Sequence, residues 1–346
     1  MQGLLLTSLV LSVYCYSIVA IEPWKKIDVT GTKPSGLWHT LTFRNGTSML
    51  LFGGGIKRKN VWSFYNDLWR INLLSEKPKW EIVIPDGQAA SPPKRFGSAG
   101  VKLGNKMYMF GGYNEDSGRF NDLWSFDLVT ASWSRLIAHD ISSSPPARNA
   151  HSAVLRGNIM YVFGGYLDGK LNDLWAIDLS ATPLSWSSIT ANGASGSPSK
   201  RDEPAAVLFG DKMYVFGGAP SNSRSNELYE IDLSSSQPAW TKLYPTGPPS
   251  ARSGVISFIR DGKMLVFGGF SSNALKDTWE IDLSKEAKEW RQILPGNAKN
   301  LPPTCEGGKG VMLEDSIFIF GGRGIGRRVG AHFGLMNQIE KSILDL

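Results

Sequence analysis

The sequence has little cysteine, which excludes a disulfide-built fold. Only Cys15 and Cys305 carry a thiol among 346 residues. Cys15 falls in a leader described below, so the mature chain would keep one cysteine and form no internal disulfide. A chain of this size can instead bury a large apolar core. We expect Cys305 to be a small buried residue, and a reactive or intermolecular thiol is the alternative.

Histidine is also scarce, and the patterns that hold metals or cofactors are missing. None of the four histidines, His39, His139, His151 and His332, pairs with another at a metal-binding spacing. The sequence contains no Gly-x-Ser-x-Gly motif, no phosphate loop and no dinucleotide fingerprint within a βαβ unit. We therefore expect no cofactor and no metal. A net charge of +6 without a nucleic-acid motif gives no reason to expect DNA or RNA as a partner.

Charge is absent from residues 1–20, MQGLLLTSLVLSVYCYSIVA. This mostly apolar run ends at Ala20, a suitable cleavage site, and predicts a signal peptide. An uncleaved signal anchor is the alternative, although the run is short for a span of about 20 apolar residues and no second such run follows. On the first interpretation, residues 21–346 form the mature protein. It would be secreted, extracellular or lumenal, and would not stay inserted in a membrane.

Glycine and tryptophan are abundant, and both recur at a fixed spacing. Phe-Gly-Gly occurs with its Phe at 52, 110, 163, 216, 267 and 320. An apolar run such as KMYMF precedes each copy and predicts a buried strand that the glycines end. Segments like NDLWRINL and NDLWAIDL follow, and another Trp comes about six residues after each segment ends. Each repeat therefore predicts four short strands, which we call a to d, with strand b ending in the glycine pair.

This pattern resembles the kelch repeat in its glycine doublet, its downstream Tyr/Trp pair and its period near 50 residues. The resemblance covers residues 24 to 346. It implies an all-β fold, a six-bladed kelch-type β-propeller with four-stranded antiparallel blades.

The two ends of the chain indicate how the ring closes. The sixth repeat offers a strand c near the terminal KSILDL but lacks the strand-d Trp, whereas EPWKKIDVTG, with Trp24, resembles a strand d. We expect the N-terminal strand to complete the last blade, since this pairing buries both terminal sheet edges.

Features that occur in every repeat are most simply structural. Ten of the twelve Trp occupy the two repeat positions. The Asp of NDLW is expected to cap a turn, and His39 and His151 are expected to share one repeat position. Function should lie in residues that do not repeat.

The d–a and b–c connections lie on one face of the predicted ring, where the first and last repeats are irregular. Trp38 and Trp62 fall outside the two Trp positions, and both belong to the first repeat. Basic residues occupy the b–c loops of these two neighbouring repeats: Lys57, Arg58 and Lys59 in the first, and Arg323, Arg327 and Arg328 in the last. We expect one positive, aromatic patch suited to an acidic protein segment or a glycan, and a solvated charged loop is the alternative.

Arginines form a second candidate site. Four repeats begin strand a with an arginine near the predicted central mouth: Arg95, Arg148, Arg201 and Arg252. Kelch propellers that bind acidic peptides use arginines there, so the resemblance implies a ligand-binding role. The alternative is that these arginines pair with neighbouring blades. Glu203 and Glu306 lie close behind and could neutralise the arginines or move protons on a bound sugar.

Asn45-Gly46-Thr47 is the only Asn-x-Ser/Thr site, and it lies on the opposite face. It is either a glycosylation site or simply a good hairpin turn. Together these features favour a secreted, monomeric, non-catalytic module that binds an acidic protein segment or a glycan. The alternative is a cofactor-free isomerase, mutarotase or cyclase that acts on a small anionic substrate, with Glu203 or Glu306 as the proton-moving group.

Overall fold

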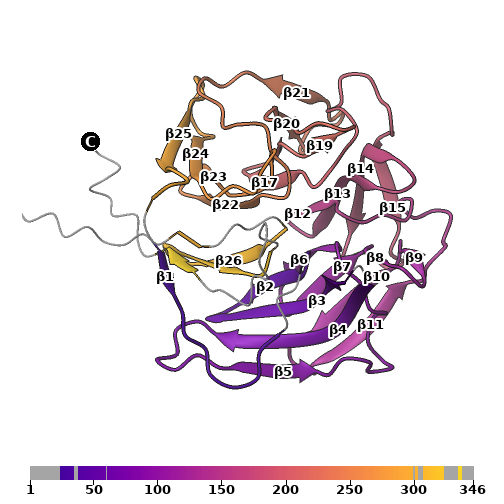
Figure 1. Cartoon of the computed structure of the whole chain (residues 1–346). Helices are drawn as coiled ribbons and strands as arrows, with labels where there is room; N and C mark the ends of the chain where they lie inside the picture. Colours follow the sequence, from indigo (N-terminus) through magenta and orange to yellow (C-terminus); the bar gives the residue numbers. More distant parts are fainter. Residues whose placement is uncertain are drawn as a thin grey trace, which may run out of the picture.

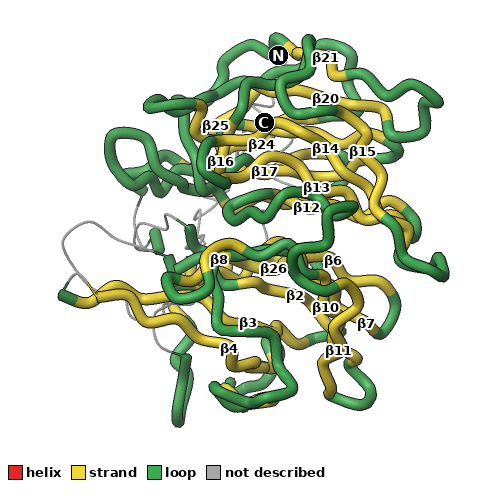
Figure 2. Tube along the Cα trace, turned by 90° about the vertical axis from the view of Figure 1, so that its right-hand side faces the viewer, coloured by secondary structure: helices red, strands yellow, loops and turns green. Residues whose placement is uncertain are grey.

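The regular structure of the chain is entirely β-strand wherever the structure describes it. The computed structural model describes residues 24–34, 38–59, 61–298, 301–302, 307–322 and 334–336. The tube in Figure 2 accordingly shows strands joined by turns and loops. In these ranges no helix has the length and apolar character needed to cross a membrane. The predicted signal peptide, residues 1–20, lies outside them.

Within the described residues, the strands form six four-stranded sheets and two short extra pairs. The first three sheets hold β2 (Leu41–Asn45), β3 (Ser48–Arg58), β4 (Val61–Asn72) and β5 (Trp80–Ile84); β6 (Ala99–Leu103), β7 (Lys106–Phe110), β10 (Leu123–Asp127) and β11 (Ser132–Ile137); and β12 (Ser152–Arg156), β13 (Ile159–Tyr166), β14 (Lys170–Asp178) and β15 (Trp186–Thr190). The next two hold β17 (Ala205–Phe209), β18 (Lys212–Phe216), β20 (Leu228–Asp232) and β21 (Trp240–Leu243); and β22 (Ile256–Arg260), β23 (Lys263–Phe267), β24 (Thr278–Asp282) and β25 (Trp290–Leu294).

The last sheet holds β26 (Lys309–Leu313), β27 (Ser316–Phe320), β28 (Gly334–Met336) and β1 (Trp24–Lys26). The short pairs are β8 (Tyr113–Asn114) with β9 (Gly118–Arg119), and β16 (Arg201–Asp202) with β19 (Ala219–Pro220).

The sheets are arranged around the centre of the molecule as the blades of a β-propeller, with strand a of each blade innermost (Figure 1). Each strand a contacts the next one in the order β2, β6, β12, β17, β22, β26 and back to β2. All pairings between neighbouring strands of these sheets are antiparallel. The turns between strands therefore lie alternately on the two faces of the propeller.

The two ends of the chain meet in the last sheet. Strand β1 pairs with β28, with Trp24 opposite Met336, and so takes the place of a strand d. The expected strand c near KSILDL is wrong in position, because β28 fills that role at Gly334–Met336. Strand c must pair with β27, and β28 follows β27 along the chain. Residues 341–346, the KSILDL segment, lie outside the described residues.

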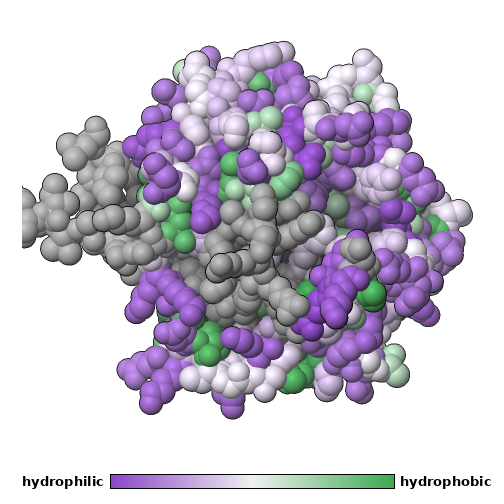
Figure 3. Space-filling view, in the orientation of Figure 1, coloured by the Kyte–Doolittle hydropathy of each residue, from purple (hydrophilic) through white to green (hydrophobic). Residues whose placement is uncertain are grey.

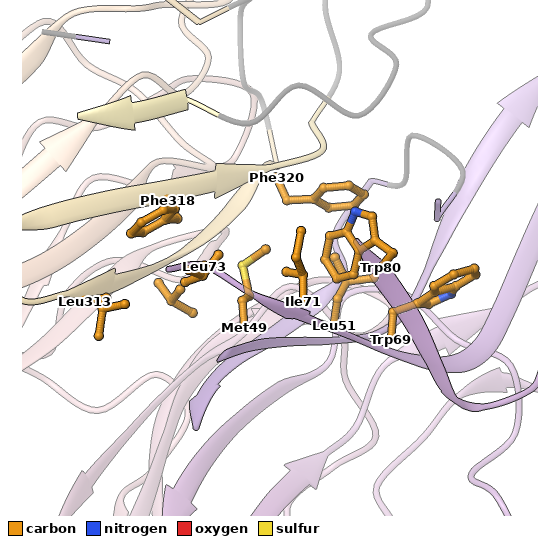
Figure 4. Packing of buried hydrophobic residues seen from close by; sticks show 10 residues of the cluster. Met49, Leu51, Trp69, Ile71, Leu73, Trp80, Leu313, Phe318 and Phe320 are labelled. Carbon is orange, nitrogen blue, oxygen red and sulfur yellow. The ribbon is translucent and has the colours of Figure 1, made fainter. Parts of the chain in front are cut away.

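One aromatic contact is repeated between neighbouring blades. The strand-d Trp of one blade packs against the Phe of Phe-Gly-Gly in the preceding blade, with ring centroids 4.8 to 5.3 Å apart. The pairs are Phe52–Trp133, Phe110–Trp186, Phe163–Trp240, Phe216–Trp290, Phe267–Trp24 and Phe320–Trp80. Figure 4 shows Phe320 against Trp80 in the apolar cluster between the last and first sheets. The scaffold role predicted for these Trp residues agrees with these contacts.

The face of the molecule seen in Figure 3 is mainly polar where it is coloured, as expected for a fold that packs its apolar residues between the blades. Scattered hydrophobic side chains lie between the polar ones on this face. Single apolar side chains on a surface are normal and need no special account.

Candidate functional site

The four arginines expected at the mouth are buried and fully engaged. Their exposed fraction is 1% for Arg95 and 0% for Arg148, Arg201 and Arg252. Arg95 donates from Nη1 and Nη2 to the two carboxylate oxygens of Asp122, at 2.6 and 3.0 Å, and from Nη1 to the Gly111 carbonyl. The same arrangement joins Arg148 to Asp173 and Arg252 to Asp277, and Arg201 donates to Glu227.

These arginines join neighbouring blades through their backbone. The side chain of Arg95 bonds within its own blade, while its amide donates to the Tyr65 carbonyl and its carbonyl accepts from Gly54 of the preceding blade. A buried guanidinium with a bidentate carboxylate has no surface left for an acidic ligand. The geometry therefore favours a structural role for these arginines over ligand binding. The pairing differs in one respect from the expected alternative, because each acidic partner lies in the arginine's own blade and not in a neighbouring one.

The expectation that the Asp of NDLW caps a turn is wrong. In four blades this carboxylate accepts a hydrogen bond from the indole Nε1 of the Trp two residues later, at 2.5 to 2.8 Å. Turn capping belongs to a second Asp of strand c, five residues after the NDLW Asp, as where Asp127 Oδ1 accepts from the amides of Val129 and Thr130. The carboxylate of NDLW is not available to cap a turn because it lies inside the blade. In three blades it neutralises the buried arginine there.

Blade 1 breaks this rule. Asp67 is 8% exposed and accepts from Trp69 Nε1, but it has no arginine, and its Oδ1 makes no hydrogen bond. Burial raises the pKa of Asp67, against the lowering effect of the Trp69 hydrogen bond. Asp67 is thus a buried carboxylate without the positive charge that its counterparts have.

A closed ring of backbone hydrogen bonds surrounds the central mouth. It joins one residue per blade, two positions before strand a: His39, Gly97, Ala150, Glu203, Gly254 and Gly307. Each amide donates to the carbonyl of the residue in the preceding blade, at 2.8 to 3.3 Å, and His39 donates to Gly307 to close the ring. All six have a positive φ, between 51° and 71°. This conformation suits glycine, and it costs about 1–3 kcal/mol for a residue with a larger side chain.

His39 and Glu203 are the two members of this ring with polar side chains, and they pair across the mouth. Three hydrogen bonds separate them in either direction around the ring, so they stand on opposite sides. The His39 Nε2 and Glu203 Oε1 atoms are 3.1 Å apart, and Ser253 Oγ donates to Glu203 Oε2 at 2.9 Å. Both residues have a positive φ, and they contact each other. Backbone strain of this kind often occurs at functional sites, so this pair is a candidate functional feature.

The environment of Glu203 does not suit a catalytic acid or base. Burial alone would raise its pKa, but the contacts with His39 and Ser253 outweigh burial and lower the pKa to about 2. Such a carboxylate stays ionised near neutral pH and is a weak base. Glu306, the other candidate for proton transfer, lies outside the described residues. The enzyme alternative therefore gains no support from Glu203.

A cavity of about 240 Å³ extends from the ring along the strands a. His39 and Glu203 line it, together with His151 and Lys309. The expectation that His39 and His151 share a repeat position is wrong by one residue: His39 aligns with Ala150, the neighbour of His151, because Leu41 and Ser152 occupy matching places opposite their Phe-Gly-Gly Phe. The two histidines consequently have different surroundings.

A group of stacked aromatic rings lies on the d–a and b–c face. We call Trp38, Trp62, Phe64, Phe96 and Tyr113 the aromatic shelf. Trp62 is nearly parallel to Phe96, with centroids 5.4 Å apart and planes at 7°, and Trp38 stacks on Trp62 at 5.5 Å. Phe64 stacks on Phe96, and Tyr113 meets both edge-on. Every shelf residue keeps part of its surface exposed.

A long basic hairpin adjoins the shelf. Strands β3 and β4 extend beyond the other b–c pairs and project from the molecule (Figure 2). Lys57, Arg58 and Lys59 are exposed near its tip, and Lys57 Nζ lies 5.7 Å from the Trp62 ring centroid. Arg323, Arg327 and Arg328, predicted to continue the patch, lie outside the described residues.

The sequence prediction found Trp38 and Trp62 but missed the other three shelf residues. Phe96 directly follows Arg95, and Tyr113 directly follows a Phe-Gly-Gly, so both stand at positions where the repeats differ from one another. A comparison of those positions between the repeats would have revealed them. Asn45 ends β2 at the hairpin turn before β3, where Gly46 has a φ of 55°. Asn45-Gly46 therefore forms a hairpin turn, one of the two roles expected for it, and glycosylation of Asn45 stays a prediction.

The described residues contain no group of three or more His, Cys, Asp or Glu that could hold a metal ion. The chain is similar in sequence to known kelch proteins. The family model for the "KLHDC2/KLHL20/DRC7 Kelch-repeats domain" matches residues 7–144 and 138–322. Kelch domain-containing protein 3 of Homo sapiens is 31% identical over 281 residues, which cover 75% of this chain and 70% of that protein.

Two other similar proteins share less sequence identity with this chain. Adagio-like protein 3 of Oryza sativa subsp. japonica is 28% identical over 281 residues, which cover 77% of this chain and 43% of that protein. The solved structure titled "Structure of YjhT" superposes with a TM-score of 0.64 at 16% identity, covering 87% of this chain and 94% of that chain, and supports the fold alone. From the family match and the identity to the human relative, the chain belongs to the kelch-repeat family.

Proposed function

We propose that this chain is a protein-interaction module whose partner docks on the d–a and b–c face, over the aromatic shelf. The shelf carries this proposal because the repeat does not require it. The recurrent Trp and Phe residues pack between blades, whereas the shelf rings stack on one another at the propeller face and remain partly exposed. Partly exposed Trp and Tyr residues are typical anchors of protein interfaces.

The neighbouring charges favour an acidic partner, either a protein segment or a glycan with acidic groups. Three exposed basic residues stand on the hairpin beside the shelf, and Arg119 lies over the rings of Tyr113 and Tyr166, at 5.2 and 4.6 Å from their centroids. Arg stacked on aromatic rings can bind a carboxylate while the rings supply apolar contact. Within this proposal the protein is secreted, monomeric and composed of one six-bladed ring over residues 21–346.

The test is a binding screen of the purified mature protein on acidic peptides and on sulfated or sialylated glycans. For a ligand found in this way, Trp62→Ala should weaken binding about 10- to 100-fold, the effect of losing an interface anchor. The triple variant Lys57→Glu, Arg58→Glu, Lys59→Glu should weaken it further at low salt, and affinity for the wild type should fall with rising ionic strength.

Lys285→Glu with Lys288→Glu is the matched control, because both lysines lie on the c–d connection of the opposite face, where Lys285 is exposed and Lys288 is partly exposed. Reversal of these charges should leave binding unchanged. If a verified ligand binds the Trp62 and hairpin variants as tightly as the wild type, the shelf is not the interface.

A further inference from the structure

Besides the His39–Glu203 pair, the central cavity is lined by a lysine and a second histidine that the interaction surface does not use. Lys309 of blade 6 and His151 of blade 3 line the cavity from opposite sides of the propeller. They are near enough that the charge of Lys309 influences the pKa of His151. Neither side chain belongs to the aromatic shelf or to the buried arginine pairs.

Lys309 departs from the repeat at a position where the other blades have small or apolar residues. The residue opposite the Phe-Gly-Gly Phe is Leu41, Ala99, Ser152, Ala205 or Ile256 in blades 1 to 5, and Lys309 in blade 6. A lysine at this position puts a positive charge beside the cavity, and burial lowers its pKa. The scaffold has no need of this charge, since five blades form the same strand without it.

Neither group has a hydrogen-bond partner within bonding distance among the residues that the structure describes. Lys309 makes no hydrogen bond or ion pair with them. His151 is 7% exposed, and both of its ring nitrogens lack such a partner, although the nearby Phe110 backbone raises its pKa through a weak interaction. Burial lowers the pKa of His151 to about 3, and the positive charges of Arg148 and Lys309 lower it too, so its ring is neutral and can donate one N–H.

Glu203, the acid whose charge acts on Lys309 in the described part of the chain, does not fill this gap. Glu203 acts on Lys309 through its charge, but its Oε1 contacts His39 and its Oε2 accepts from Ser253. Lys309 and His151 thus line the cavity as donors with no acceptor at hydrogen-bond distance among the described residues. Buried donors of this kind are usually satisfied by a bound group.

We propose that the central cavity binds a small anion, a carboxylate or phosphate, between Lys309 Nζ and a ring N–H of His151. The volume of about 240 Å³ lies just below the roughly 300–1,000 Å³ of sites for drug-sized ligands, so it suits a small solute and not a polymer. The site is separate from the shelf, and the anion would be held inside the scaffold. Anion binding here would stabilise the propeller through mass action.

The experiment titrates acetate, and separately inorganic phosphate, into the purified protein at constant ionic strength and follows the thermal midpoint. At least one of the two should raise the midpoint with a saturable dependence on concentration. Lys309→Ile should abolish this response, and His151→Ser should weaken it at least several-fold. Both variants should fold, because blade 5 has Ile256 at the first position and blade 2 has Ser98 at the second.

Lys25→Met serves as the control, since Lys25 is exposed on β1 and far in sequence from the cavity residues; it should keep the full response. The proposal is overturned if neither anion gives a saturable shift in the wild type. It is equally overturned if Lys309→Ile responds as the wild type does, because the anion then binds elsewhere. Loss of the response in Lys309→Ile with partner binding on the shelf retained would separate this site from the interface.

Discussion

Asp67 and Asp122 occupy the same repeat position but should respond in opposite ways to loss of their charge. Asp122 holds the buried Arg95 in a bidentate ion pair, whereas Asp67 has no arginine. The perturbation is Asp→Asn at each position, which preserves shape and one side-chain oxygen for the neighbouring Trp. Asp173→Asn, opposite Arg148, repeats the Asp122 change in a second blade.

The magnitudes follow from what each substitution leaves behind. Asp122→Asn strands a guanidinium with 0% side-chain exposure, and removing one partner of a buried ion pair typically costs about 3–5 kcal/mol of unfolding free energy. Asp67→Asn removes a carboxylate whose charged form burial disfavours. We expect that change to be neutral or stabilising, by up to about 1 kcal/mol near pH 7.

Urea unfolding followed by tryptophan fluorescence measures both changes, with the slope m as the check that the unfolded surface is unaltered. The pH dependence gives a second check. The folded pKa of Asp67 is raised above the ordinary 3.8 of an aspartate, so the cost of its charge is absent below pH 3.8 and develops as pH rises through the folded pKa. The advantage of Asp67→Asn should therefore shrink between neutral pH and about pH 4.

Two results would refute this reasoning. If Asp67→Asn destabilises the protein as much as Asp122→Asn, Asp67 has a charged partner and is not an isolated carboxylate. If Asp122→Asn and Asp173→Asn are both harmless, the arginine pairs do not stabilise the blades, and a ligand-binding role for these arginines would regain support.

Two further predictions concern the ring. Trp24→Ala should lower the free energy of unfolding by about 3–5 kcal/mol, because Trp24 packs on Phe267 and its strand joins the two chain ends. Deletion of residues 21–30 should prevent a soluble fold. If urea unfolding shows that Trp24→Ala costs no more than Lys25→Ala, a change at an exposed residue of the same strand, closure of the ring by β1 would be contradicted. Glu203 has a folded pKa of about 2, below the ordinary 4.5 of a glutamate, so its stabilising effect is present above pH 4.5 and lost as pH falls toward 2. Glu203→Gln should flatten the acid dependence of stability in this window, and an unchanged acid profile would rule out the His39–Glu203 contact as its source.

The repeat made the blades predictable from the sequence. The Phe-Gly-Gly and Trp positions fall where strands b, c and d lie, because a residue that packs between blades must recur once per blade. The N-terminal strand was also predictable, since Trp24 supplies the one strand-d Trp missing from the last repeat. Strand c of that repeat was misplaced because its sequence departs from NDLW and leaves little pattern to align.

The candidate site was less predictable, for a physical reason. An arginine at the start of strand a looks the same in the sequence whether its guanidinium faces a ligand or an acid 25 to 27 residues later, as the pairs Arg148–Asp173 and Arg95–Asp122 show. The approach of His39 to Glu203 depends on closure of the ring, and no local spacing encodes it. Shelf residues such as Phe96 were missed because a single aromatic side chain indicates its use only when its neighbours in space are known.

The unbroken series of Phe–Trp contacts has a consequence for how the protein can come apart. In a linear stack of repeats an end unit can fray while the others persist. Here every blade has a neighbour on both sides, and the blade that contains both chain ends is no exception. Loss of one blade opens two interfaces at once, so the blades should melt in a single cooperative transition, and a protease should find no frayed repeat from which to start.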